Sequence, residues 1–318
     1  MSDSYSVDLV IPCYQEEDAL PQTLPIILDY MRAVLNRENI AAQSFRILLV
    51  DDGSEDRTWE IIVGLTKANP EVCGVKLSRN CGHQNAMLAG LSSSAADVVI
   101  TMDVDLQDDI EAIADMLLEY QRGSDLVLGV RDDRASDTAF KRTTANSYYR
   151  LLSLMGVPAV ENHADYRLMS RRALVALLAH NETNLFLRGL IPKIGFKTTL
   201  IPYLRKAREH GTTKYTLRKM LRLALDGITS FSVVPLRAIS ALGILIFIVS
   251  LFASAWVFAT AILLPDRVVP GWASTALPTF FLGGVQLLAL GVIGEYIGKI
   301  YLETKRRPRF FVEESILK

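Results

Sequence analysis

The chain has 318 residues, with 34 lysines and arginines against 35 aspartates and glutamates, and 50% of its residues are apolar. This balance gives no basic field of the kind that nucleic-acid-binding proteins carry, so we expect no nucleic-acid partner. Three cysteines without paired spacing, Cys13, Cys73 and Cys81, argue against a disulfide framework and against a zinc site. The length allows one large domain with an appendage, or two domains.

The N-terminal part alternates short apolar strands with helices. Strands are expected at 8–11, 45–50, 74–77, 97–102 and 125–129, and helices at 20–35, 57–68, 84–93 and 110–120. Strict alternation predicts an α/β domain with a mostly parallel sheet and helices on both faces. Such sheets bind ligands at the carboxyl ends of their strands, so the residues that follow each strand are the first candidates for a site.

Acidic residues follow three of these strands: Glu16 the first, Asp51 and Asp52 the second, and Asp103 and Asp105 the fourth. Carboxylates gathered at one edge of a sheet repel one another unless a cation joins them. Taken alone, the Asp-Asp-Gly-Ser segment at 51–54 is equally typical of a turn with a helix cap.

The Asp-Val-Asp segment at 103–105 is more specific. Residues at i and i+2 of an extended segment point the same way, and Mg²⁺ or Mn²⁺ on a nucleotide diphosphate needs few protein ligands. A metal–diphosphate site is therefore predicted at Asp103 and Asp105. The sequence has neither a Walker-type phosphate loop nor a Gly-x-Gly-x-x-Gly turn, which disfavours an ATPase or a dinucleotide enzyme. His83 follows the third strand and is expected to be a solvated loop residue, with a role in the site as the alternative.

The last third of the chain is far more apolar. Residues 238–264 and 272–294 contain no charged side chain. A membrane-spanning helix needs about 20 apolar residues, so both runs are long enough. We expect a membrane region at 235–304 with two transmembrane helices, at about 236–264 and 272–298. Two buried helices of a soluble core are the alternative, which the absence of a polar face disfavours.

Basic residues flank this apolar region on both sides, which sets its expected orientation. The positive-inside rule places the catalytic domain at 1–210, the basic tail at 305–318 and both termini in the cytoplasm. Between domain and membrane, residues 211–234 read as basic amphipathic juxtamembrane helices suited to an anionic membrane surface. The alternative is that their apolar face packs on the globular domain.

These features together resemble the family 2 glycosyltransferases with a GT-A fold. Within that family the chain is most similar to the polyprenyl-phosphate glycosyltransferases, the group that includes dolichol-phosphate mannose synthases and the bacterial GtrB and ArnC proteins. The matching segments run in order along nearly the whole chain: VDLVIPCYQEE, LLVDDGSEDRT, KLSRNCGHQNAMLAGL, TMDVDLQDD, ADYRLMSRRAL, FLRGL, RKAREHGTTKY and SFSVVPLR. The resemblance implies a Rossmann-like GT-A domain followed by juxtamembrane helices and a two-helix membrane hairpin.

The resemblance also implies a role for individual residues. The base and ribose of the donor would be held by Pro12, Tyr14, Glu16, Asp51 and Asp52, with Lys76 and Arg79 near the nucleotide. Asp103 would contact the donor and belong, with Asp105 and Gln107, to the metal site. Asp165 would lie beside the reacting centre, and the acceptor phosphate would be gripped, or the donor covered, by Arg131, Arg205, Arg208 and Lys214. The family often has proline at the position of Ile110, a departure that should affect only the start of a helix.

The implied reaction is an inverting transfer of a sugar from a nucleotide-diphosphate sugar, with Mg²⁺ or Mn²⁺, to undecaprenyl or another polyprenyl phosphate. The product would serve cell-envelope glycan or lipopolysaccharide modification at the bacterial inner membrane. UDP-glucose is the first choice of donor, and a UDP-linked amino-arabinose, a hexosamine or GDP-mannose are the alternatives. A homo-oligomer, by resemblance a tetramer, is also implied.

Two other functions would fit part of the sequence. A processive polysaccharide synthase shares the aspartates but also carries a Gln-x-x-Arg-Trp motif, and none of Trp59, Trp256 and Trp272 follows such a motif. A non-catalytic membrane scaffold or lipid transporter subunit would need no metal site. The presence of Asp103, Asp105 and Gln107 argues against this second reading.

Overall fold

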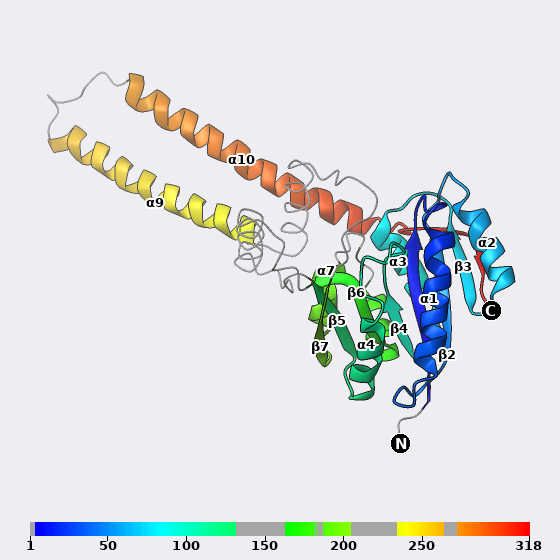
Figure 1. Cartoon of the computed structure of the whole chain (residues 1–318). Helices are drawn as coiled ribbons and strands as arrows, with labels where there is room; N and C mark the ends of the chain where they lie inside the picture. The colour runs from blue at the N-terminus through cyan, green and yellow to red at the C-terminus, as the bar shows by residue number, and fades with distance from the viewer. Residues whose placement is uncertain (1–3, 132–162, 181, 183–186, 205–233, 264–271) are drawn as a thin grey trace. The chain divides into compact units, whose positions relative to one another are not determined.

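Figure 1 shows the computed structural model of the chain, which describes residues 4–131, 163–180, 182, 187–204, 234–263 and 272–318. These residues form two compact units. One unit contains two long helices, α9 (Val234–Leu263) and α10 (Trp272–Thr304). The other contains the rest of the described chain and is organised around one sheet.

The strands of that sheet follow the order β7-β5-β6-β4-β1-β2-β3-β8. Their bounds are β1 Tyr5–Cys13, β2 Ala42–Asp51, β3 Val72–Leu77, β4 Val98–Thr101, β5 Leu126–Arg131, β6 His163–Ser170, β7 Thr198–Tyr203 and β8 Val312–Ile316. β4, β1, β2 and β3 are parallel neighbours, and β5 is parallel to β7. β6 and β8 run antiparallel to their neighbours. The expected α/β class with a mostly parallel sheet is confirmed.

Helices cover both faces of the sheet (Figure 1). Their bounds are α1 Leu20–Leu35, α2 Thr58–Ala68, α3 His83–Ser93, α4 Ala112–Gln121, α6 Arg171–Leu178 and α7 Leu187–Leu190, with a 3₁₀ turn at Ile191–Ile194. Val7, Leu9 and Ile11 of β1 are buried with α1 and α4, whereas Val10 is buried with α3 and α6. Successive side chains of a strand point to opposite faces, so a strand buried on both faces must be apolar throughout.

Each strand and helix expected between residues 8 and 129 is present, with bounds shifted by a few residues. The antiparallel strand β6 inserts between β4 and β5, a pairing that the alternation did not predict. The tail at 305–318 also differs from expectation, because β8 joins the edge of the sheet beside β3. A five-residue strand with three polar residues between Val312 and Ile316 gives little hydrophobic signal, so the sequence did not predict it.

Helices α9 and α10 cover the two apolar runs, and α10 continues past residue 298 to Thr304. Within the described residues, the segment Phe281–Thr304 is long and apolar enough to cross a membrane, with a mean hydropathy of 1.5. The described apolar part of α9, Val234–Ile246, is shorter. The juxtamembrane helices predicted at 211–234 lie almost entirely outside the described residues, as does the connection between α9 and α10.

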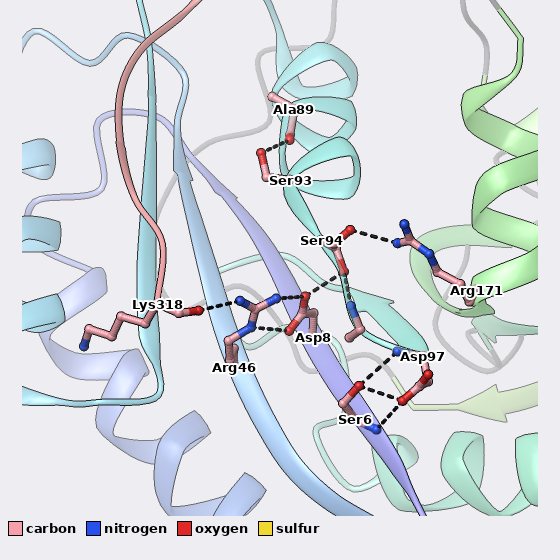
Figure 2. A network of polar contacts seen from close by, with 10 residues as sticks. Ser6, Asp8, Arg46, Ala89, Ser93, Ser94, Asp97, Arg171 and Lys318 are labelled. Atoms are coloured by element: carbon pink, nitrogen blue, oxygen red, sulfur yellow. Dashed lines mark hydrogen bonds and ion pairs between the residues drawn. The ribbon is translucent and has the colours of Figure 1, made fainter.

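A polar network joins β1 and β2 to the end of α3 and to Lys318 (Figure 2). Asp8 of β1 is 1% exposed, and its two carboxylate oxygens accept from Nε and Nη2 of Arg46 at 2.9 and 2.7 Å. The Ser94 hydroxyl donates to the same carboxylate at 2.6 Å, and Nη1 of Arg46 donates to the carbonyl oxygen of Lys318 at 2.9 Å. The buried Asp8 carboxylate thus joins β1 to β2 and to the end of α3, and Arg46 extends the network to Lys318, two residues beyond β8.

Gly90 of α3 allows this helix to approach the sheet closely. A Cβ at this position would lie 2.4 Å from Cγ1 of Val10 and 2.8 Å from Cγ2 of Val50. We expect Gly90→Ala to lower the free energy of unfolding by about 1–3 kcal/mol, because overpacking displaces the helix. Gly64 of α2 has no atom within 4 Å of such a Cβ, so Gly64→Ala should be neutral or stabilising by up to about 1 kcal/mol. Thermal unfolding of the two variants checks this, and equal effects would contradict it.

Candidate active site

The carboxyl ends of the central strands lie in register. Cys13 at the end of β1 pairs with Asp51 of β2, and Asp51 pairs with Lys76 of β3. Asp103 is the second residue after the end of β4. Strand pairing therefore brings the predicted residues of the first four strands to one edge of the sheet. This is the edge at which parallel α/β sheets bind their ligands.

Asp103, Asp165 and His83 meet at this edge from three separate elements. Nε2 of His83, the first residue of α3, lies 3.6 Å from Oδ1 of Asp103 and 3.7 Å from Oδ2 of Asp165 in β6. The side chains of His83 and Asp103 are 44% and 34% exposed, so a ligand can reach them. Asp103 and Asp165 thus approach the same imidazole, and His83 does not lie apart from the site in solvent.

Arg167 holds Asp165 from inside the sheet. Its side chain is fully buried, and its Nη2 donates to Oδ1 of Asp165 at 2.8 Å. The Thr101 hydroxyl donates to the carbonyl oxygen of Asp165 at 2.5 Å and lies 3.4 Å from Nε of Arg167. A buried cation on one carboxylate oxygen fixes the orientation of the carboxylate, which leaves the other oxygen, Oδ2, facing His83.

Negative charge accumulates around Asp103. Burial raises the pKa of its carboxyl group above the ordinary range; His83 opposes this shift, and the carboxylates of Asp108, Asp165 and Asp105 add to it. Carboxylates that repel one another in this way favour the binding of a cation, because a cation relieves their mutual repulsion.

The loop after β4 has an unusual backbone. Leu106 has φ +50°, in the left-handed region that residues with a Cβ seldom adopt. The N–H of Gln107 donates to Oδ1 of Asp105 at 3.2 Å, which closes a tight turn. Strained backbone of this kind persists where the surroundings over-determine it, and it concentrates at functional sites.

The predicted metal ligands Asp103, Asp105 and Gln107 lie in the segment that follows β4. Among the residues that the structure describes, no group of three or more histidine, cysteine, aspartate or glutamate side chains is placed to hold a metal ion. Asp103 and Asp105 supply two carboxylates, and Gln107 is 6% exposed with a buried Nε2 that has no hydrogen-bond partner in the described chain. Because the two ends of an amide exchange by rotation, Gln107 can present its oxygen there. Two carboxylates and an amide oxygen fit a hard cation that takes its other ligands from a diphosphate.

Arg131 at the end of β5 is held at the same edge by a second polar group. The Tyr203 hydroxyl, at the end of β7, donates to Oδ1 of Asp108 at 2.6 Å. Nε of Arg131 donates to the Tyr203 oxygen at 3.3 Å, and its Nη2 lies 4.0 Å from Asp108 Oδ1. The guanidinium is thereby tied to the loop that carries Asp105 and Gln107.

The carboxyl end of β2 and the residue after it are two aspartates with different surroundings. The carboxylate oxygens of Asp52 accept from the N–H groups of Cys81 and Gly82 at 2.7 and 2.9 Å. Asp51 accepts from the N–H of Ser54 at 3.2 Å through Oδ1, and its buried Oδ2 has no hydrogen-bond partner among the described residues. Asp52 thus fixes a loop, whereas Asp51 keeps an acceptor for a ligand.

The remaining predicted residues are placed as follows. Pro12 lies near the end of β1, and Tyr14, just beyond this strand, is 41% exposed. The N–H of Glu16 donates to Thr58 Oγ1 at 2.9 Å. Lys76 is the penultimate residue of β3, and Arg79 lies two residues beyond this strand. Arg205, Arg208 and Lys214 fall outside the described residues.

Two contributors to this edge, Arg167 and Tyr203, were not predicted from the sequence, and a role for His83 was predicted only as the alternative. His83 carries a weak signal, because its place after the third strand says nothing about its distance from Asp165. Arg167 and Tyr203 lie within strands. Because charged residues are seldom fully buried without a partner, an arginine in a buried strand could have indicated the role of Arg167.

Comparison with known proteins decides the family. The description "Glycosyl transferase family 2" matches residues 8–178, more than half of the chain. The chain belongs to this family. The transferase is 46% identical to the uncharacterized glycosyltransferase YkoT of Bacillus subtilis, over 96% of this chain and 90% of that one. It is 39% identical to the bactoprenol glucosyl transferase of Shigella phage SfX, over 96% and 98% of the two chains.

The expected enzyme class, a glycosyltransferase, is confirmed by this membership. Among solved structures, glucosyl-3-phosphoglycerate synthase from Mycobacterium tuberculosis in complex with Mn²⁺ and UDP-Glc aligns over 71% of this chain and 78% of that one. Its TM-score is 0.43 at 15% identity, a likeness too slight to say anything about the ligands of the transferase.

We expect Arg167→Met to lower the free energy of unfolding by about 3 kcal/mol, because it leaves Asp165 uncompensated in a largely buried position. Adding Asp165→Asn to this variant should restore part of the loss. Arg57→Met removes a pair with Glu60 in which both side chains are more than 70% exposed, so it should cost less than about 1 kcal/mol. Thermal unfolding of the full chain in detergent compares them, and similar losses for Arg57 and Arg167 would contradict the prediction.

Proposed function

We propose that the protein transfers a sugar, with inversion, from a nucleotide-diphosphate sugar to undecaprenyl or another polyprenyl phosphate. UDP-glucose is the first choice of donor. The observation that carries the proposal is the meeting of Asp103, Asp165 and His83 at the carboxyl edge of the sheet, in a chain that continues into two long apolar helices. Relatives named bactoprenol glucosyl transferase, at 37–39% identity over nearly the full length, support the lipid acceptor.

On the donor side, Oδ2 of Asp51, which has no hydrogen-bond partner in the described part of the chain, supplies an acceptor for an N–H or hydroxyl group of the nucleoside. Asp103, Asp105 and Gln107 would hold Mg²⁺ or Mn²⁺, which neutralises charge on the leaving diphosphate. Lys76 and Arg79 add positive charge at the end of β3. These groups favour departure of a nucleoside diphosphate by positioning and electrostatics alone.

On the acceptor side, the nucleophile is a phosphate oxygen. A phosphate monoester has a second pKa of about 6, so it is largely ionised at neutral pH and needs no strong general base. Arg131 orients this phosphate, together with Arg205, Arg208 and Lys214 of the adjoining segment. Asp165, fixed by Arg167, acts as a weak base or orienting group through the oxygen that faces His83.

The C-terminal helices suit a lipid acceptor. A hairpin of α9 and α10 in the bacterial inner membrane, with both termini in the cytoplasm, keeps the catalytic domain beside the membrane surface. The polyprenyl tail then lies in the bilayer and its phosphate at the surface. Assembly into a homo-oligomer is part of the same proposal.

The donor is tested with purified full-length protein, undecaprenyl phosphate and a panel of UDP-glucose, UDP-linked amino-arabinose, a UDP-hexosamine and GDP-mannose. We expect UDP-glucose to be consumed and a polyprenyl-phosphate sugar of inverted anomeric configuration to form. Turnover of another sugar would correct the donor, and retention would contradict a single displacement. No turnover of any donor would favour a non-catalytic membrane scaffold.

Metal dependence follows from the acidic edge of the site. We expect EDTA to abolish turnover and added Mg²⁺ or Mn²⁺ to restore it, because the leaving diphosphate is otherwise uncompensated. Asp105→Asn should raise the metal concentration needed for half-maximal rate. Full turnover in excess chelator would overturn the metal assignment.

Asp165→Asn is expected to lower kcat about 100-fold with little change in donor affinity, since its carboxylate acts on the acceptor side. Asp97→Asn is the matched control. Asp97 precedes β4 at the opposite edge of the sheet, where it accepts from the N–H and hydroxyl of Ser6. Wild-type kcat in Asp165→Asn with normal donor binding would remove the proposed role.

A further inference from the structure

Strand β8 carries a bulge beside the nucleotide side of the site. Its pairing with β3 runs Gly74 with Ile316, Val75 with Ser315 and Lys76 with Glu314, and then shifts so that Leu77 pairs with Val312. Glu313 is therefore the extra residue of the bulge. Bulges re-aim a side chain out of the regular alternation and are frequent beside active sites.

The side chain that this bulge re-aims contacts Lys76. Oε2 of Glu313 lies 3.1 Å from Nζ of Lys76, and the lysine side chain is 25% exposed. Lys76 pairs in register with Asp51, whose Oδ2 accepts no hydrogen bond from any residue that the structure describes. The ion pair thus lies next to the group that we assign to the nucleoside.

The pair is not required to keep β8 on the sheet. The strand is anchored by its own ladder and by the bond from Ser78 N–H to the Phe311 carbonyl at 3.0 Å. The Trp59 indole donates to Oε2 of Glu314 at 3.1 Å, and Nζ of Lys318 donates to the carbonyls of Thr66 and Asn69. An ion pair whose acid is 52% exposed adds little stability to such an anchor.

We propose that Glu313 is a positioning residue for the donor nucleotide, and that it acts by holding the Lys76 ammonium at the carboxyl end of β3. The inference rests on the proposed function. A lysine has a long flexible stem and three N–H donors, so one carboxylate contact orders it and leaves two donors for the ligand. Ordering the side chain before binding lowers the entropy lost when the nucleotide arrives. The segment that follows the membrane helices thus completes the donor site.

The test is a double-mutant cycle in the purified full-length protein, with UDP and GDP titrated by calorimetry. We expect Glu313→Gln to weaken nucleotide binding about threefold and Lys76→Met about tenfold. Because Glu313 acts through Lys76, the double variant should bind no more weakly than Lys76→Met alone. In turnover, Glu313→Gln should raise the donor KM and leave kcat at saturating donor unchanged.

Glu314→Gln is the matched control, since it lies on the same strand and contacts Trp59 in place of Lys76. It should leave both nucleotide affinity and KM unchanged. Equal weakening by Glu313→Gln and Glu314→Gln, additive losses in the double variant, or wild-type binding by Glu313→Gln would each overturn the inference. If the wild-type chain bound neither UDP nor GDP, the proposed function itself would fail.

Discussion

The buried Arg167 guanidinium sets the geometry of the site. It lies inside the sheet with one carboxylate oxygen of Asp165 at 2.8 Å, and the Thr101 hydroxyl binds the backbone of the same aspartate. Two charges taken out of water are stable only with close geometry and further hydrogen bonds, so the pair has little freedom to move. Asp165 therefore presents its second oxygen at one place, 3.7 Å from His83. Asp103 reaches the same imidazole from the end of β4.

The antiparallel insertion of β6 makes this arrangement available. A sheet built only from the parallel strands would bring Asp103 to the carboxyl edge without a partner from the second half of the domain. β6 pairs with β4 and β5 and places Thr101 opposite Arg167 in register. The same edge then receives Arg131 from β5 and Tyr203 from β7, and these two residues tie the loop after β4 to the outer strands.

The C-terminal part of the chain returns to the sheet after α10. β8 covers the exposed edge of β3, which would otherwise present unpaired backbone groups to solvent. Its ladder, the Lys318 contacts and the Arg46–Asp8 network join it to the core of the domain (Figure 2). Along the chain, one folded unit therefore supplies segments both before and after the apolar helices α9 and α10.

The sequence by itself determined the local elements, the two apolar helices and the carboxylates that follow the first, second and fourth strands. Hydrophobic periodicity depends on neighbours along the chain, so strands such as β1 and β2 and helices α1 to α4 could be predicted. The position of Asp103 and Asp105 near the carboxyl edge of the sheet was predictable, because both residues closely follow a buried strand. Only the tertiary structure decided that His83 joins Asp103 and Asp165, that Arg167 fixes Asp165, and that the tail forms β8. These contacts join residues far apart in the chain, and their pairing depends on strand order and register, which local pattern does not encode.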